Sequence, residues 1–296
     1  MIIDFRLRPP FGDFLNSAQY NLERNAVMSR RLGMWQAESA KQRSMTLFLE
    51  EMDRAGISTA VMPGRVSAVF GNVSCDTMRQ LMERWPGRFE GFAGVDLLDY
   101  DAAALVIERE VLNGPFAGLN IEPLFTYSFP LYADDRRIYP LYEMAQAAHI
   151  PVMIMSGGFG NAHISYTHPG RIDTVATDFP HLTIVTPHAC WPHAMEIIQV
   201  ALRKPNVHIS PDIYSMGLPG SQDYLLAART FLQDQFLFGS AHPTLPMEGC
   251  VDFYKKQGFT PEIWEKITWK NARRILELKG SSPKSSFKGR SECLMK

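Results

Sequence analysis

Short runs of β-forming residues alternate with helical patterns along the whole chain, and this alternation restricts the possible folds more than any other feature. Strands are expected in eight places, at residues 2–5, 59–62, 89–95, 118–121, 152–155, 183–185, 207–210 and 236–238. Helices are expected between them, at residues 41–55, 76–85, 101–112, 135–148, 171–178, 193–202 and 221–232. A helix between consecutive strands returns the chain to the same edge of the sheet, so the strands run parallel. Eight such units predict a single (β/α)8 barrel of the TIM type, regular or distorted, with its site at the carboxyl ends of the strands.

The length of the chain suits one barrel better than two domains. Its 296 residues, 46% of them hydrophobic, can bury one large core. We therefore expect a single α/β domain over residues 1–279. After Leu278 the sequence is rich in serine, lysine and glycine and poor in core-forming residues, which predicts a flexible tail over residues 280–296.

The charge balance argues against large polyanionic partners. The 30 lysines and arginines nearly match the 31 aspartates and glutamates, so we expect neither nucleic acid nor a membrane surface as a partner. The opening MIIDFRLRPPFGDF lacks the pattern of a signal peptide, and the four cysteines are scattered. No run reaches the ~18 consecutive apolar residues of a membrane span. These features predict a cytoplasmic protein that acts on a small molecule.

The segment from Phe11 to Ser39 is too long for a plain connection between a strand and its helix. Long loops in compact domains are often lids or binding loops, so we expect this segment to help cover the site. Aromatic residues in the predicted loops favour an apolar or aromatic substrate that carries a carboxylate or an enol. These residues are Phe11, Phe14, Phe125, Tyr127, Tyr166, Trp191 and Tyr214.

Five blocks of sequence carry a resemblance to a known family: IIDFRLR, PVMIMSGG, LTIVTPHACWPHAMEII, NVHISPDIY and LFGSAHP. In their order and spacing, the chain resembles the amidohydrolase-2 family over nearly the whole barrel. The resemblance implies a set of metal ligands at the carboxyl ends of the strands. In that family His-x-His ends the first strand, histidines follow the fifth and sixth strands, and an aspartate follows the eighth. Together they hold a divalent metal that activates water.

This chain departs from the family pattern at most of these positions. Arg6 and Arg8 stand where the paired histidines would be, Met155 falls at the histidine of the fifth strand, and Ala241 replaces the aspartate. Of the family's ligands only His188 remains. Arginine has no lone pair to offer a cation, and a catalytic zinc normally takes three protein ligands. We therefore expect no bound metal and no other cofactor.

Two arginines instead of two histidines would change the chemistry of the site. Arg6 and Arg8 alternate along the first strand, so their side chains are expected on one face, at the mouth of the barrel. There they would bind a carboxylate or an oxyanion, because each guanidinium offers a fork of donors. The alternative is structural: the arginines form buried ion pairs with Asp4, Glu122 or Asp212.

Three residues are candidates for proton transfer. His188, at the end of a predicted strand, is the first candidate for a general acid or base, although it could merely hold Trp191 and its loop in place. Asp212 follows the next strand and could orient His188 or an arginine, or cap a helix. His242, beside the lost aspartate, is a second acid or base or only a rim residue.

Further residues at strand ends are candidates for substrate binding, as polar or aromatic groups around the site. For Glu122 a salt bridge to Arg6 or Arg8 is an equal alternative, and Tyr214 could simply be packed. Ser156 lacks the glycine spacing of a nucleophile elbow. The candidates are Arg65, Asn120, Glu122, Ser156, Trp191 and Tyr214.

Three functions fit this pattern. The first is a metal-independent hydrolase of a small carboxylated or enolised compound, such as a lactone, in which Arg6 and Arg8 hold the anion and His188 with Asp212 moves the proton. The second is a carbon–carbon lyase or decarboxylase, a chemistry that the resemblance also allows. The third is an inactive barrel that binds an anion. A homodimer is an expectation from the family alone.

Overall fold

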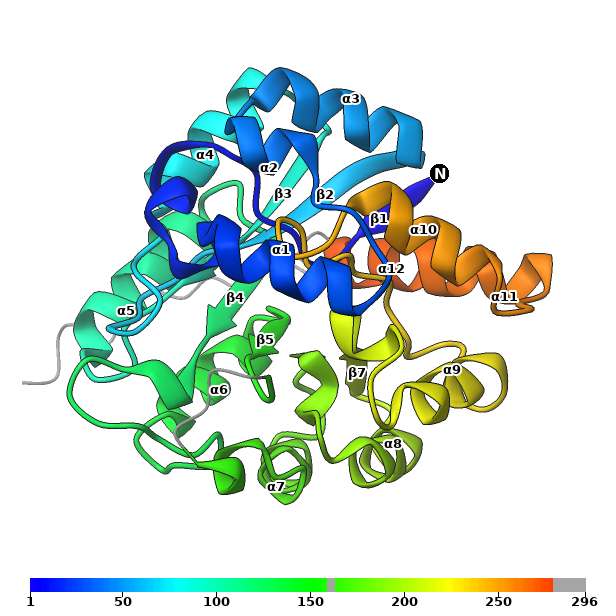
Figure 1. Ribbon diagram of the computed structural model, residues 1–296. Helices are drawn as coiled ribbons and strands as arrows, with labels where there is room; N and C mark the ends of the chain where they lie inside the picture. Colours follow the sequence, from blue (N-terminus) through cyan, green and yellow to red (C-terminus); the bar gives the residue numbers. More distant parts are fainter. Residues whose placement is uncertain (159–162, 279–296) are drawn as a thin grey trace, which may run out of the picture.

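The computed structural model describes residues 1–158 and 163–278. Seven parallel strands form one sheet in chain order, and the sheet curls around a central axis with helices on its outer side (Figure 1). The fold is therefore α/β of the TIM-barrel type, as predicted. The tail predicted at residues 280–296 lies outside the described residues. The strands are β1 (Ile2–Asp4), β2 (Ile57–Pro63), β3 (Phe89–Gly94), β4 (Gly118–Ile121), β5 (Val152–Ile154), β6 (Ile184–Pro187) and β7 (Val207–Ser210).

The eighth predicted strand, residues 236–238, is present only as a single parallel bridge between Phe236 and Ile209. This segment still lies between the two edges of the sheet. Leu237 donates to the carbonyl of Ile209 in β7, and Phe5 donates to the carbonyl of Phe238, each at 2.9 Å. The N–H of Phe238 donates instead to Ile267, outside the sheet. For this reason no ladder forms toward β1, and separate hydrogen bonds close the ring, among them Ala241 N–H to the carbonyl of Arg6 and Arg8 N–H to the carbonyl of His242, each at 3.0 Å.

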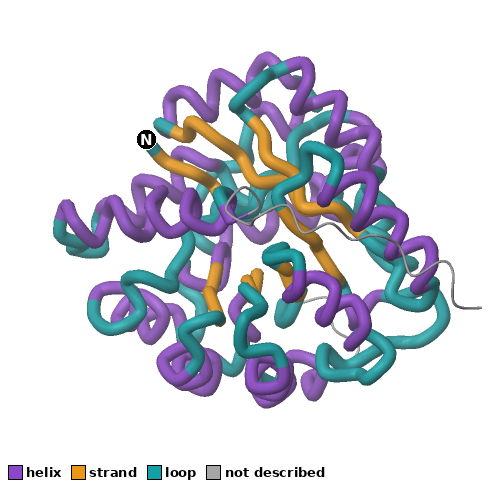
Figure 2. Tube along the Cα trace, turned by 180° about the vertical axis from the view of Figure 1, so that it is seen from behind, coloured by secondary structure: helices purple, strands orange, loops and turns teal. Residues whose placement is uncertain are grey.

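Helices surround the strands on the outside, as the view from behind also shows (Figure 2). Local signals define their ends: Ser74 caps the first turn of α4 by accepting from Thr77, and Gly56 ends α3 in the left-handed conformation. The sequence did not predict α10, α11 or α12. No helix in the described part of the chain is long and apolar enough to cross a bilayer. The helices are α1 (Leu22–Arg31), α2 (Glu38–Gln42), α3 (Met45–Ala55), α4 (Cys75–Arg84), α5 (Tyr100–Val106), α6 (Tyr139–Ala147), α7 (Gly170–Asp178), α8 (Ala194–Arg203), α9 (Ser221–Arg229), α10 (Met247–Lys255), α11 (Pro261–Glu265) and α12 (Asn271–Leu276).

Two hydrophobic cores follow from the alternation of side chains along the strands. The larger core fills the space between the strands and the outer helices. The smaller core lies inside the barrel. It is formed by side chains of β1, β2, β3, β5 and β6, by residues next to β1 and β4, and by the eighth segment, and α12 closes one end of it. Its members include Ile3, Phe5, Val61, Phe92, Ala117, Met153, Val185, Leu237, Ala272 and Ile275.

The segment 11–39 contains α1, which crosses in front of the strands (Figure 1). We call residues 11–39 the covering segment. Hydrogen bonds attach this part of the chain to the barrel: Tyr20 Oη donates to the carbonyl of Arg8 at 2.8 Å, and Ser29 Oγ donates to the carbonyl of Thr244 at 2.9 Å. The segment is thus held over the end of the barrel at which β1 ends.

Candidate functional site

A cavity of about 340 Å³ opens at the carboxyl ends of the strands. Its walls come from β-strand ends and loops around the barrel and from the covering segment, which agrees with the predicted position of a site. Four arginines line it. The lining residues are Arg6, Arg8, Gln19, Arg24, Met28, Arg65, Phe70, Phe125, Met155, Gly157, Gly158, His188, Ile213, Tyr214, Ala241 and Thr244.

Arg6 and Arg8 both line this cavity, but not for the reason predicted. β1 ends at Asp4, and the chain bends at Phe5 and Arg6, so the two arginines follow the strand rather than alternate along it. The carboxylate of Asp4 accepts from the backbone N–H of Arg6 at 3.1 Å and from that of Ser240 at 3.0 Å. The first bond stabilises the bend at residues 5 and 6, and the second joins it to the chain that follows residues 236–238.

The backbone at three strand ends adopts left-handed torsion angles that are unusual outside glycine. The φ angle is 65° at His188, 46° at Asp212 and 57° at Ala241. Each such residue costs about 1–3 kcal/mol, and such residues cluster at functional sites. At Gly158, with φ of 104°, an added Cβ would lie 3.0 Å from Tyr214 Oη and 3.3 Å from His188 Cδ2. This glycine therefore lets the chain approach His188 closely.

His188, Asp212 and Arg6 form one buried network. Asp212 Oδ1 lies 3.1 Å from His188 Nδ1, and Asp212 Oδ2 lies 2.9 Å from Arg6 Nη1. Burial alone would raise the pKa of Asp212, but the charges of His188 and Arg6 hold it below its usual value. An ionised carboxylate only accepts, so Nδ1 carries the proton and Nε2 keeps its lone pair. Asp212 thus contacts both partners that the sequence analysis proposed for it.

The imidazole of His188 is neutral at neutral pH. Burial, and next the charge of Arg6, lower the pKa of His188 to about 4, against the opposing effect of Asp212. Its Nε2 forms no hydrogen bond with the described residues, and the side chain borders the cavity. A neutral histidine with a free lone pair can accept a proton from a bound molecule.

Arg8 differs from Arg6 in having no partner for its guanidinium. The residue is 2% exposed, and neither Nε nor Nη2 forms a hydrogen bond within the described chain. Burial and the charges of Arg6 and Arg65 lower the pKa of Arg8 well below its usual value. A buried cation without a counter-charge costs free energy, so the position of Arg8 favours an anionic ligand.

Arg65 is paired with Glu122. Its Nε donates to Glu122 Oε1 at 2.9 Å, and its Nη1 donates to Gln19 Oε1 of the covering segment at 2.5 Å. The expectation that Glu122 pairs with Arg6 or Arg8 was therefore wrong, because Arg65 reaches it from the loop after β2. Asn120 lies behind this pair and donates to the carbonyl of Gly64 at 2.7 Å.

Aromatic rings form part of the cavity wall. Tyr214 lines the cavity, stacks on Trp191 at 4.9 Å between centroids and meets the ring of His188 edge-on. Trp191 donates through Nε1 to the carbonyl of Pro219, and it supports Tyr214 from behind. Phe70 and Phe125 pack edge to face at 4.6 Å on the opposing loops.

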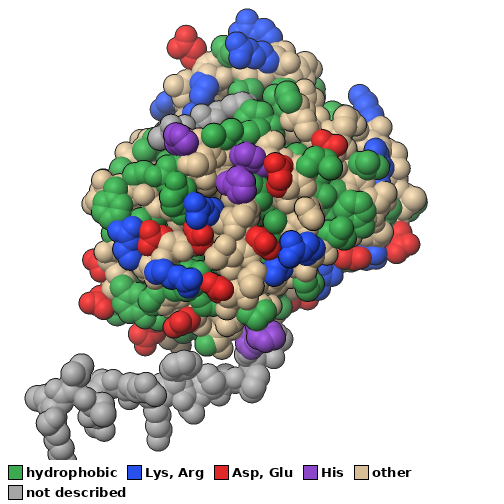
Figure 3. Space-filling model, turned by 90° about the horizontal axis from the view of Figure 1, so that it is seen from below, with side chains coloured by type: hydrophobic (Ala, Val, Ile, Leu, Met, Phe, Trp, Pro, Cys, Tyr) green, Lys and Arg blue, Asp and Glu red, His purple; other side chains and the backbone are tan. Residues whose placement is uncertain are grey.

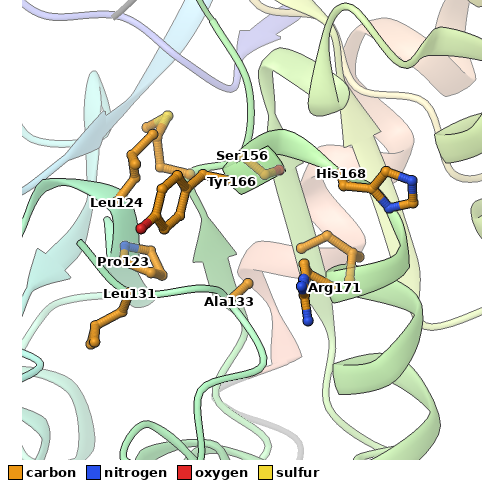
Figure 4. Close-up of a pocket in the computed structure, with 10 residues that line it drawn as sticks. Pro123, Leu124, Leu131, Ala133, Ser156, Tyr166, His168 and Arg171 are labelled. Carbon is orange, nitrogen blue, oxygen red and sulfur yellow. The ribbon is translucent and has the colours of Figure 1, made fainter. Parts of the chain in front are cut away.

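Ser156 lies outside the main cavity. It borders a neighbouring void of about 10 Å³ with Tyr166, His168 and Arg171 (Figure 4). Its Oγ accepts from Cys190 Sγ at 3.3 Å. The structure gives Ser156 a packing contact rather than a place beside His188.

His242 is also not brought to the cavity, although its neighbour Ala241 lines it. Its ring is fully buried against Phe48 of α3, at 5.1 Å between centroids, and neither ring nitrogen has a partner in the described chain. Burial lowers the pKa of His242 to about 3. A ring facing the outer helix layer cannot exchange a proton with a ligand beside His188.

Sequence reasoning did not single out Gln19, Arg24 and Met28, which line the cavity from the covering segment. The length of that segment predicted its position, but no local motif distinguishes these three side chains from their neighbours. Of the aromatic residues expected at the mouth, Phe125 and Tyr214 line the cavity. Phe14 is instead part of the large core.

The side chains at the positions of the family's metal ligands do not fit a divalent cation. Arg6, Arg8, Met155, His188 and Ala241 all line the cavity. Arg6 and Arg8 are cations, and Ala241 offers only a methyl group. The thioether of Met155 already accepts from Arg6 Nη2 at 3.6 Å. Among residues 1–158 and 163–278, no three histidine, cysteine or acidic side chains are grouped to hold a metal.

Comparison with known proteins gives a consistent picture. The family model described as amidohydrolase matches residues 27–278. No curated protein matches the chain. A crystal structure of an uncharacterized TIM-barrel protein from Bordetella bronchiseptica is similar at 39% identity and a TM-score of 0.89, covering 94% of this chain and 99% of that one.

More distant structures share the fold. A dihydroxybenzoic acid decarboxylase from Polaromonas, solved with bound manganese and the inhibitor 2-nitroresorcinol, has 18% identity and a TM-score of 0.62, covering 86% of this chain and 94% of that one. A 4-oxalomesaconate hydratase from Rhodopseudomonas palustris has 19% identity and a TM-score of 0.63, covering 94% of this chain and 96% of that one. At these identities the likeness concerns the fold.

Proposed function

The chain belongs to the amidohydrolase family, and from this premise we propose that it is a metal-independent hydrolase of a small carboxylated or enolised compound, such as a lactone. Members of this family are enzymes, and the cavity offers a base and cationic donors side by side. The observation that carries the proposal is the neutral His188, oriented by Asp212 and flanked by Arg6.

His188 acts as the general base in this proposal. Its Nε2 takes a proton from water, the water oxygen forms a bond to the acyl carbon, and Asp212 stabilises the imidazolium that results. The ester C–O bond then breaks, and the proton passes from Nε2 to the leaving oxygen. The protein thereby supplies the activated water that the rest of the family obtains from a cation.

The arginines supply the electrostatic part. Arg8 has free donors in a buried place, where a charged hydrogen bond is stronger than in water. It would hold the carboxylate or the enolate of the substrate, while Arg6 faces the oxygen on which negative charge develops. Donors already in place lower the barrier without reorganising during the reaction.

A carbon–carbon lyase or decarboxylase is the second candidate. The dihydroxybenzoic acid decarboxylase among the structural neighbours favours it. Here the cationic site would bind the carboxylate and His188, once protonated, would deliver a proton to carbon. The low pKa of His188 favours the base role over this acid role in the free enzyme.

The test combines metal removal with product analysis. Purified protein is treated exhaustively with a chelator, and its metal content is measured together with turnover of a panel of carboxylated lactones and hydroxybenzoates in ¹⁸O-labelled water. We expect hydrolysis that survives chelation and places one ¹⁸O atom in the product, and that is lost in His188→Gln.

Two results would overturn the proposal. Release of carbon dioxide without incorporation of ¹⁸O identifies the decarboxylase. Loss of activity on chelation, restored by manganese or zinc, would show that the cavity works with a cation after all.

A further inference from the structure

We propose that the cavity contains a second anion-binding subsite at its mouth, formed by Arg24 of α1, and that the substrate is a dicarboxylate held between Arg8 and Arg24. This inference rests on the proposed function, because it concerns the substrate of the same site. It extends that proposal from one acidic group to two and gives the covering segment a role in selecting the substrate.

The charges around the cavity do not cancel. Four arginines line it, and two buried carboxylates pair with them: Asp212 with Arg6, and Glu122 with Arg65. Within the described chain, Arg8 and Arg24 have no carboxylate partner. The residues around the cavity therefore carry about two uncompensated positive charges, which a dianion would neutralise.

This accumulation contrasts with the charge balance of the chain. The chain as a whole has a formal net charge of −1. On the outer face seen in Figure 3, lysines and arginines lie interspersed with aspartates and glutamates. Unpaired arginines that gather in a partly closed cavity, in a chain with such a balance, indicate a ligand with the complementary charge.

The two unpaired arginines occupy different places. Arg8 is almost fully buried at the end of β1, whereas Arg24 is exposed on the covering segment and still lines the cavity. Burial lowers the pKa of Arg24, against an opposing effect of Tyr214. Arg8 and Arg24 thus border the same cavity at different depths, one where the protein is closed and one where it is open to solvent.

The position of Arg24 is fixed rather than free. Its backbone N–H donates to Asn21 Oδ1 at the start of α1, and its Nη2 donates to the carbonyl of Ala18 at 2.8 Å. The hydrogen bond from Ser29 to the carbonyl of Thr244 holds the same helix against the barrel. The guanidinium of Arg24 is therefore already ordered beside the cavity, and binding a ligand would cost little further side-chain entropy.

Part of the cavity wall is aromatic. Phe70 and Phe125 both line the cavity and pack edge to face, and Arg65 lies over the ring of Phe70 at 5.3 Å. The frame that joins the two carboxylates is accordingly expected to be flat and unsaturated or aromatic, because such a frame packs against these rings.

Calorimetric titration of the full-length chain with pairs of acids tests the inference. The pairs are benzoate with phthalate, isophthalate and terephthalate, and acrylate with fumarate and maleate. At least one diacid should bind native protein about tenfold or more tightly than its monoacid, the strength of one charge-assisted hydrogen bond. Added salt should reduce this preference.

Three variants assign the effect to residues. Arg24→Gln should remove the preference for the diacid and leave binding of the monoacid unchanged, whereas Arg8→Gln should weaken both. Arg31→Gln, an exposed arginine on the same helix that does not line the cavity, is the matched control and should behave as native. Arg24→Lys should retain part of the preference because it retains the charge.

The inference fails if no diacid of the panel binds more tightly than its monoacid, or if Arg24→Gln changes binding no more than Arg31→Gln does. This outcome is distinct from failure of the proposed function, since binding is measured without turnover. A chain that hydrolyses monoacid lactones without any dependence on Arg24 would retain the proposed function and lose the second subsite.

Discussion

The interior of this barrel has two halves of opposite character. The lower half is filled by the apolar core that includes Phe5, Phe92 and Leu237, and α12 closes it. The upper half holds arginines, carboxylates and buried polar atoms that have no hydrogen-bond partner among the described residues, such as Arg8 Nε and Glu122 Oε2. The same strands build both halves, so the contrast separates what stabilises the fold from what the site is built to bind.

The largest effect is expected in the lower half. Phe92→Ala removes a fully buried ring that packs edge to face on Phe5 at 5.6 Å, and it should lower the free energy of unfolding by about 3–5 kcal/mol, measured by urea denaturation. Phe125→Ala in the cavity wall is the matched control. Phe125→Ala should lower the free energy of unfolding by less, because the removed ring borders the cavity rather than the packed core. Equal losses in the two variants would erase the distinction between the halves.

A change of opposite sign is expected in the upper half. Arg8→Met removes an unpaired buried charge and keeps an unbranched side chain that fills part of the same space, so the free energy of unfolding should rise by about 1–3 kcal/mol while activity is lost. Arg6→Met is its counterpart. This variant leaves Asp212 without its guanidinium partner and should be destabilised, since breaking a buried pair strands the remaining charge. Destabilisation of both variants to the same extent would contradict the description of Arg8 as unpaired.

The smallest effect concerns pH. The pKa of His188 is about 4, and only its neutral form can act as the base. We therefore expect kcat/KM to be constant from about pH 6 to 8 and to fall to half near pH 4. Stability should decline over a different interval. Burial lowers the pKa of His188 to about 4 and that of His242 to about 3, so the stability that these two neutral histidines contribute is full above pH 6.5 and is lost as pH falls through about 4 and 3.

A variant separates the two pH dependences. His242→Leu should reduce the acid-induced loss of stability, because His242 titrates at about 3 in an apolar place, and should leave the profile of kcat/KM unchanged. A shift of the kcat/KM profile in this variant would return His242 to the site.

The lower half of the barrel was the more predictable one. Alternating apolar strands specify which side chains face inward, and the seven strands of the sheet overlap the first seven predicted ranges. The eighth failed as a strand because the N–H of Phe238 bonds to Ile267, a contact from distant sequence that no local pattern announces. The helices after residue 232 were missed altogether.

The upper half was predictable where the family register applied and not elsewhere. Arg6, Arg8 and His188 line the cavity at the positions that the resemblance indicates. His242 does not, because the left-handed turn at Ala241 directs the next side chain toward α3. Arg24 comes from a segment whose docking depends on hydrogen bonds to Arg8 and Thr244, and tertiary contacts of this kind leave no signal in sequence.

The covering segment also bears on how such a protein can change its specificity over evolution. It contributes Gln19, Arg24 and Met28 to the cavity, yet none of the barrel's strands passes through it. Insertions, deletions and substitutions there can accumulate without altering the order of strands or the inner core. A lineage of such barrels can thus diversify its ligands by remodelling one stretch of about thirty residues while the His188–Asp212 pair underneath is inherited intact.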